Sequence, residues 1–158
     1  MQDIRRRIGE AAERSGREAD EIKLVTVSKT HSVTAIRQAI SAGITIFGEN
    51  KVQEAETKIA EIGQDEVEWR LIGHLQSNKA RKAVELFDVI ESLDSVDLAK
   101  RLERLCIEDG RSELPVFIEV DLAGEETKTG ISEDELPDLV RILKHCVSLR
   151  FDGLMVLP

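Results

Sequence analysis

Tyrosine is absent from this chain, and aromatic residues, cysteine and long apolar runs are scarce. No apolar run approaches the roughly 18 residues that cross a bilayer, so we expect no membrane span. Basic residues neither cluster nor alternate with aromatic ones, and the formal net charge is -9. This balance argues against a nucleic acid or an anionic membrane as the main partner, and we expect a cytoplasmic protein that binds neither.

Patterns typical of metal sites and disulfides are also missing. The two cysteines, Cys106 and Cys146, lie on separate predicted helices, and the three histidines form no HExxH spacing. Two such cysteines suit reduced, buried thiols better than a disulfide framework. We therefore expect neither a disulfide nor a structural zinc site.

What the sequence does have is a regular alternation of short β-branched runs with helical apolar stripes. Its 158 residues, 41% of them hydrophobic, fit a single domain spanning 1–158. Six runs are predicted to be strands: 24–29, 44–47, 67–72, 89–93, 116–122 and 154–157. Ser32 is expected to cap the helix after the first strand. Ser132 and Glu135 form a capping box that predicts the start of the last helix.

This alternation predicts right-handed βαβ crossovers and therefore an α/β fold with a parallel sheet. A (β/α)8 barrel of the TIM type needs eight βα units, and the chain holds about six. An open doubly wound sheet could stop at six strands, but it usually carries a glycine-rich phosphate-binding turn. Neither GxGxxG nor a Walker A sequence occurs here, so nucleotide-binding folds lose their best support.

The first predicted strand ends on Lys29, and a helical pattern follows at once. In parallel α/β sheets, ligands and reactive groups gather at the carboxyl ends of the strands. An amine held there among apolar side chains loses hydration, which favours the uncharged form that can condense with an aldehyde. The alternative is a solvated lysine at the end of a strand, and this stretch alone leaves both interpretations open.

Motifs at the other strand ends resemble those of one known family. They read VSKT at 27–30, GENKVQE at 48–54, WRLIGHLQSNK at 69–79, SLDS at 92–95, ETKTG at 126–130 and GLM at 153–155. In this order and spacing, over nearly the whole chain, they resemble the YggS/PROSC family of pyridoxal 5′-phosphate (PLP) homeostasis proteins. The resemblance implies a fold like the amino-terminal barrel of alanine racemase. It also implies that the matching lysine, Lys29, holds PLP through a Schiff base, the internal aldimine.

Four further residues are predicted to bind the cofactor, each with a plainer alternative. Asn50 could orient the cofactor ring or cap the following helix. His74, also at a strand end, could hydrogen-bond near the ring or simply be a packed or rim residue. Ser92 and Met155 could line the mouth of the barrel, although both also suit core packing.

No residue of this chain can be assigned to the cofactor phosphate with the same support. Lys79 and Lys128 could attract a phosphate, but exposed lysines usually have no such role. In the family, backbone amides of a later serine/glycine-rich segment and a glycine turn hold this group, and the chain ends before both. We therefore expect a barrel domain that is incomplete at its carboxyl terminus, with open sheet edges that favour self-association. The motifs also depart from the family pattern after Lys29 and at Lys51.

Two functions follow from the resemblance, and a third interpretation is a barrel fragment without a ligand. The first is a protein that carries or buffers PLP for intracellular homeostasis, with PLP-dependent apoenzymes as candidate partners and no dedicated reaction. The second is a PLP-dependent amino-acid racemase of fold type III. A two-base racemase needs a second acid or base across the ring from the lysine, often a tyrosine. Because the chain has no tyrosine, the carrier is favoured and weak or no racemase activity is expected.

Overall fold

The computed structural model describes residues 2–122 and 129–157. The chain forms one parallel sheet whose strands all pair with their neighbours in sequence, in the order β1-β2-β3-β4-β5-β6. The strands are β1 (Thr26–Val27), β2 (Ile46–Glu49), β3 (Glu68–Leu71), β4 (Val89–Leu93), β5 (Leu114–Glu119) and β6 (Leu149–Met155). A doubly wound sheet reverses its strand order, whereas a barrel adds strands in sequence, so the order identifies a partial TIM-type barrel.

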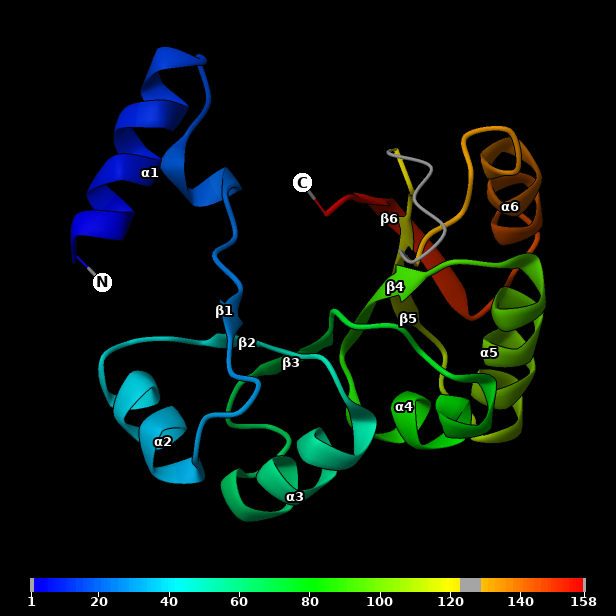
Figure 1. Ribbon diagram of the computed structural model, residues 1–158, viewed down its shortest axis with the longest axis horizontal. Coiled ribbons are helices and arrows are strands. Elements are labelled where there is room, and N and C mark those ends of the chain that lie inside the picture. The colour runs from blue at the N-terminus through cyan, green and yellow to red at the C-terminus, as the bar shows by residue number, and fades with distance from the viewer. Residues whose placement is uncertain (1, 123–128, 158) are drawn as a thin grey trace.

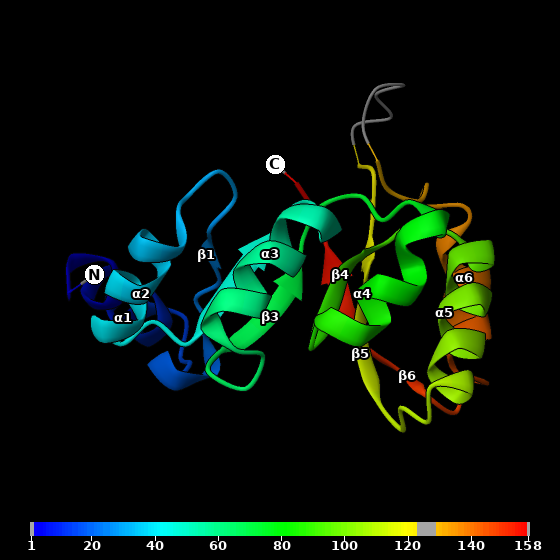
Figure 2. The same cartoon turned by 90° about the horizontal axis from the view of Figure 1, so that it is seen from below.

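The described residues form six α-helices, and five of them, α2 to α6, cover one side of this sheet (Figure 1). The six are α1 (Gln2–Arg14), α2 (Val33–Ser41), α3 (Val52–Ile62), α4 (Ala80–Leu86), α5 (Val96–Glu108) and α6 (Leu136–Leu143), with short 3-10 turns η1 (Ala19–Glu21) and η2 (Ser77–Lys79). Helices α2 to α6 follow the outer side of the curved sheet, and the inner side is open between β1 and β6 (Figure 1). Figure 2 shows α3 and α4 lying in front of the strands when the molecule is seen from below.

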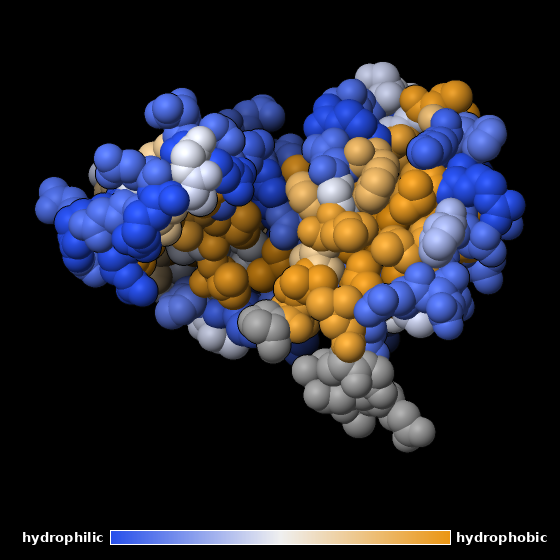
Figure 3. All heavy atoms as spheres, turned by 90° about the horizontal axis from the view of Figure 1, so that it is seen from above, coloured by the Kyte–Doolittle hydropathy of each residue, from blue (hydrophilic) through white to orange (hydrophobic). Residues whose placement is uncertain are grey.

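The core lies between the sheet and these outer helices. Each strand turns alternate side chains outward, and Phe47, Trp69 and Leu71 are almost fully buried against the helices. Helix α3 turns an apolar stripe toward the sheet, and its residues Val52, Ala55, Ile59 and Ile62 are all buried. The inner face of the sheet has no helix over it in the described chain, and Figure 3 shows apolar side chains gathered in this hollow.

Most predicted elements are confirmed, with shifts at their ends. Six strands form as predicted, but β1 pairs over two residues only, and β6 begins at Leu149 rather than at 154. Residues 149–153 of β6 were missed because Arg150 and Asp152 interrupt its apolar pattern. These two side chains bond each other on the open inner face, with Arg150 Nε donating to Asp152 Oδ1 at 2.6 Å.

The two predicted helix caps had different outcomes. Ser32 caps α2 as expected, its Oγ accepting the Ala35 N–H at 3.3 Å. The capping box at Ser132 and Glu135 was wrong as a helix start, because α6 begins at Leu136 with a proline in its first turn. Ser132 Oγ instead donates to Glu135 Oε2 at 2.7 Å in the turn before the helix. Proline suits the first turn because it has no N–H to leave unpaired there.

The two cysteines are both free thiols. Cys106 is buried on α5, whereas Cys146 is only half-buried and lies three residues past the end of α6. Burial raises the pKa of each thiol to about 11, so both stay protonated at neutral pH. The expected reduced cysteines are therefore present, although the second is not on a helix.

Candidate functional site

The open face of the sheet contains a cavity of about 470 Å³ at the carboxyl ends of the strands. It is bounded by β1, by the segments after β2 and β3, and by the end of β6. Both apolar and polar side chains line it: Val25, Val27, Lys29, Asn50, Ile72, His74, Glu91, Glu119, Thr129, Met155, Val156 and Leu157. A mostly apolar wall with a few convergent polar groups is typical of a small-molecule site, and cavities of about 300–1,000 Å³ are usual for one.

Lys29 lies two residues beyond the end of β1, with Val25 and Val27 on the same side of the chain. Because side chains alternate along a strand, these odd-numbered residues face the cavity while Thr26 and Ser28 face helix α2. The amine predicted from the sequence is therefore on the inner face of the sheet, next to apolar side chains. Its neighbour Thr30 has φ +64, the left-handed region that β-branched residues rarely adopt.

Asn50 and Gly73 bring the segments after β2 and β3 into close contact. A Cβ built on Gly73 would lie 2.5 Å from the Asn50 carbonyl oxygen and 2.8 Å from Asn50 Cα, so only glycine fits. Both residues line the cavity. The N-cap of α3 is Lys51, not Asn50, which removes the plainer alternative for Asn50 as the helix cap.

His74 lines the same cavity and is oriented by the segment after β4. Its Nδ1–H donates to Asp94 Oδ2 at 2.9 Å. The hydrogen bond fixes the plane of the imidazole ring, although about half of the side chain is exposed to solvent. The structure thus brings together Lys29, Asn50, His74 and Met155, the last of which ends β6.

Ser92 is not among the described residues that line the cavity. It is fully buried on β4, and its Oγ donates to the Gly73 carbonyl at 2.7 Å. The Ser92 side chain therefore holds the backbone of the segment that carries His74. Lys79, at the end of η2, is likewise not among the described lining residues, and Lys128 lies outside the residues that the structure describes.

The structure adds Glu119, which the sequence analysis did not single out. This carboxylate at the end of β5 is 2% exposed and lines the cavity. Thr129 Oγ1 donates to its Oε1 at 2.7 Å, and its Oε2 has no hydrogen-bond partner among the described residues. A charged residue inside an apolar strand was the available signal, because carboxylates are rarely buried without a purpose.

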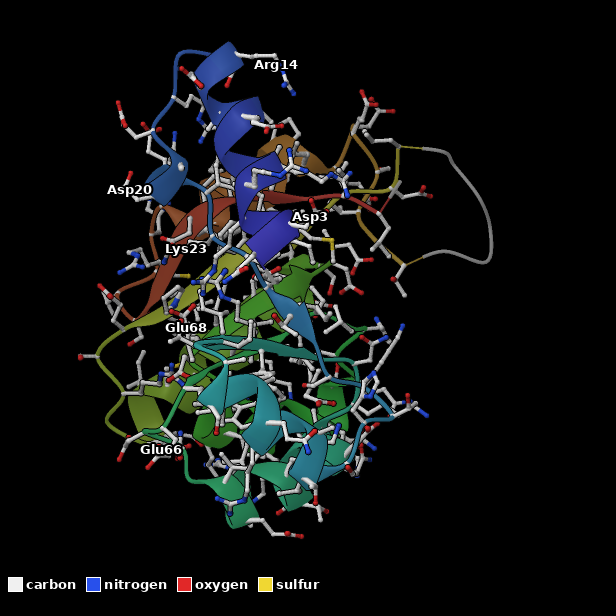
Figure 4. The ribbon with its side chains drawn as sticks, turned by 90° about the vertical axis from the view of Figure 1, so that its left-hand side faces the viewer. Asp3, Arg14, Asp20, Lys23, Glu66 and Glu68 are labelled. Carbon is white, nitrogen blue, oxygen red and sulfur yellow. The ribbon has the colours of Figure 1, made fainter. Side chains whose placement is uncertain are left out.

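A larger hollow of about 850 Å³ extends along the same face toward the amino ends of the strands. Lys23 and Glu68, labelled in Figure 4, are among the residues that line it. Arg70 also lines this hollow, and its charge is already paired. It bonds Glu68 and donates to Glu91 Oε1 at 2.7 Å. Reactive groups of TIM-type barrels lie at the carboxyl ends of the strands, which favours the smaller cavity as the site.

The fold defines the class to which this chain belongs. Residues 1–157 match the family model described as alanine racemase, N-terminal domain. An alanine racemase from Clostridium difficile superposes with a TM-score of 0.69 at 12% identity, covering 85% of this chain and 35% of that one. At this identity the likeness concerns the fold alone.

Greater sequence similarity is found within one group of proteins that share this fold. The pyridoxal phosphate homeostasis protein of Escherichia coli K12 is 41% identical over 161 residues, covering 98% of this chain and 67% of the relative. That of Pseudomonas aeruginosa is 40% identical over 152 residues, covering 96% of this chain and 66% of the relative. PipY of Synechococcus elongatus, solved with PLP bound, has a TM-score of 0.83 at 40% identity, covering 96% of this chain and 70% of PipY.

The chain belongs to the family of pyridoxal phosphate homeostasis proteins, as the YggS/PROSC motifs predicted. It spans about two thirds of the length of the curated relatives described above. In the part of the chain that the structure describes, no helix has the length and apolar character needed to cross a bilayer.

Proposed function

We propose that this protein binds PLP through Lys29 and carries or buffers it for intracellular PLP homeostasis. The observation that carries the proposal is the position of Lys29 in a cavity at the carboxyl ends of the strands, in a chain 40% identical to a relative solved with PLP. We take residues 1–158 as a single PLP-binding barrel domain. Cytoplasmic location and delivery of PLP to apoenzymes belong to the same proposal.

The residues around the cavity fit such a ligand. Val25, Val27, Ile72 and Met155 provide apolar surface for an aromatic ring, and Lys29 provides the amine. Asn50 and His74 supply an amide and an imidazole that can hydrogen-bond to ring substituents, and Asp94 fixes the imidazole. The buried Glu119 offers a carboxylate oxygen that has no partner among the described residues.

PLP supplies an aldehyde that reacts reversibly with an amine. With PLP in the cavity, Lys29 would supply that amine, and its condensation with the aldehyde would release one water molecule. Val25 and Val27, which line the cavity beside Lys29, offer apolar surface on which the ring of the bound molecule can pack. Because addition of water reverses the reaction, the bound molecule can be released unchanged, which is what a carrier requires.

A carrier is favoured over a racemase by the groups that face Lys29. Racemisation by two bases requires a second proton donor and acceptor on the opposite side of the substrate. Among the described residues that line the cavity, His74, Glu91 and Glu119 can exchange protons, and each already has a partner. His74 is half exposed and bonded to Asp94, Glu91 is paired with Arg70, and Glu119 accepts from Thr129. We therefore infer at most weak exchange of the alpha proton of an amino acid.

Absorbance titration of the purified protein with PLP tests the proposal. We expect a saturable visible band in the wild type and its loss in Lys29→Ala, with an unchanged melting temperature because Lys29 is exposed. Lys51→Ala, which removes another exposed lysine, is the matched control and should keep the band. A band that survives in Lys29→Ala contradicts the proposal. Rapid exchange of the alpha proton of alanine would favour the racemase instead.

A further inference from the structure

A buried ionic cluster lies behind Lys29, between the sheet and helix α3. Lys58 Nζ donates to Glu49 Oε1 at 2.6 Å, to Glu54 Oε1 at 2.7 Å and to the Ser28 carbonyl at 2.7 Å. Ser28 Oγ also donates to Glu49 Oε1, at 2.6 Å. Lys58 is 5% exposed and Glu49 is fully buried, so these two charges depend on each other rather than on water, while Glu54 is partly exposed.

The cluster and the cavity lie on opposite faces of the sheet. Lys29 is on the inner face, whereas Ser28 turns toward the helices because side chains alternate along β1. Lys58 belongs to α3 on the outer side, and it is not among the described residues that line the cavity. The cluster can therefore act on a ligand only through the backbone that carries Lys29.

The backbone contacts of the cluster fall on both sides of Lys29. Lys58 binds the Ser28 carbonyl, which belongs to the peptide group before Lys29. Glu54 Oε1 accepts the Thr30 N–H at 2.6 Å, and this N–H belongs to the peptide group after Lys29. Both peptide groups that flank the Lys29 Cα are thus held by side chains of one helix, α3. Because these two groups are held, the direction of the Lys29 Cα–Cβ bond is fixed.

The conformation held in this way is an unfavourable one. Thr30 is the one described non-glycine residue with a positive φ, at +64, and it is β-branched. Such residues persist only where the surroundings impose the conformation, and they gather at functional sites. A buried ion pair adds little to stability when weighed against the loss of hydration. The placement of its contacts around a strained turn indicates a positioning role rather than a stabilising one.

We propose that Lys58 is a positioning residue, which acts through Glu49 and Glu54 to hold the turn 28–30 and so places Lys29 Nζ in the cavity. The inference rests on the proposed function of Lys29. Lys58 does not touch the ligand. By holding the turn, it keeps the Lys29 side chain directed into the cavity, so that less conformational freedom is lost when the covalent bond to PLP forms.

Glu54→Gln is the mildest test, since Glu54 is on the rim of the cluster with 29% of its side chain exposed. Loss of one charge-assisted hydrogen bond should speed amide exchange at Thr30 and slow formation of the visible PLP band at Lys29, each by about tenfold. Glu61→Gln, an exposed change on the same helix, is the matched control and should alter neither rate. Exchange at Thr30 is measured without PLP, so the two rates are independent.

Two substitutions at Thr30 separate positioning from stability. Glycine adopts positive φ freely, so Thr30→Gly should melt no lower than the wild type while its reaction with PLP slows. Asparagine tolerates the left-handed conformation, so Thr30→Asn should keep the wild-type reaction rate. A cluster with only a structural role predicts that reaction rate and melting temperature fall together.

The core of the cluster is tested by a double variant, Lys58→Met with Glu49→Gln. Removing both charges avoids leaving Glu49 buried and unpaired, which would unfold the chain for an unrelated reason. We expect a folded protein with rapid Thr30 exchange and a slowed reaction at Lys29. Unchanged Thr30 exchange in the variants, or faster exchange with an unchanged PLP reaction, overturns the positioning role. A wild type that does not react at Lys29 overturns the proposed function itself.

Discussion

Glu119 is a buried carboxylate with little compensation in the described structure. One of its carboxylate oxygens accepts from Thr129, while the other has no partner among the described residues. A buried charge without full pairing lowers the stability of the fold. It also gives the cavity a carboxylate oxygen that can accept a hydrogen bond from a ligand.

Glu119→Gln should therefore stabilise the ligand-free protein. The glutamine carbonyl can still accept from Thr129, and a neutral amide costs less to bury than a carboxylate, so we expect about 1–2 kcal/mol more free energy of unfolding. Urea unfolding measures this, with the exposed Glu133→Gln as control. A less stable Glu119→Gln protein would mean that the carboxylate has a strong partner.

The stability that Glu54 gives to the turn at Lys29 should depend on pH. The hydrogen bond from Lys58, and next that from the Thr30 N–H, lower the pKa of the Glu54 carboxyl below its usual value. A lowered pKa means that the stabilisation is complete above the unfolded-state pKa, about 4.3, and is lost as the pH falls through the folded value. The wild type should thus lose stability in acid more steeply than Glu54→Gln. Urea unfolding between about pH 6 and about pH 3 measures both slopes, and equal slopes would contradict this assignment.

At the scale of single residues, the sequence pointed to Lys29, the lysine that we propose reacts with PLP, but not to the residues around it. The strand-end position and the motifs pointed to Lys29. Lys58 was overlooked because a lysine on a helix is usually solvated, although it lies three residues after the buried Ala55 and four after Glu54. That spacing places it on the inward face and within reach of a carboxylate, and it was the available signal.

Among the elements, the contact between the segments after β2 and β3 is the tightest at the site. Gly73 faces the Asn50 backbone with no room for a Cβ. Neither segment can move without the other, so the positions of Asn50 and His74 are linked. Ser92 strengthens this contact by bonding the Gly73 carbonyl.

Gly73→Ala should disturb both segments. A Cβ at 2.5 Å from a backbone oxygen forces the strands apart, and we expect a loss of about 1–3 kcal/mol in unfolding free energy together with weaker PLP binding. Gly9→Ala is the matched control, since a Cβ at that position in α1 meets nothing within 4 Å. There alanine should stabilise the helix slightly. Equal stability of the Gly73→Ala protein and the wild type would show that the segments can separate freely.

Elements were predicted well where apolar periodicity was unbroken. Strand β4 has an unbroken apolar pattern and formed where expected, over residues 89–93. The start of β6 was missed because its polar residues pair with each other on the open face, which a strand pattern read from one chain cannot reveal. Helix α6 starts later than its capping box suggested, because the proline after Leu136 determines the first turn.

At the scale of the whole molecule, sequential strand order and helices on one side give a curved sheet with two free edges. Among the described strands, β1 pairs with β2 alone and β6 with β5 alone. Val27 on the first edge is 44% exposed and Leu154 on the other is 54% exposed. Strand edges with apolar side chains invite pairing with another chain.

The 158-residue chain should therefore self-associate through these edges. Light scattering over a concentration series should show species larger than 17.7 kDa, the mass of one chain. Leu154→Lys, which places a charge on one edge, should shift the distribution toward the monomer. A monodisperse 17.7 kDa wild type with a cooperative melt would contradict this expectation.

The central claim is that one lysine, at the end of the first strand, forms the covalent bond with PLP. The most direct measurement is borohydride reduction of the PLP-loaded protein followed by peptide mapping, which makes the bond permanent and locates it. We expect the label on Lys29 in nearly all modified molecules, with little on Lys51, Lys58 or Lys79. A label mainly on another lysine, or spread evenly among the exposed ones, would contradict the account.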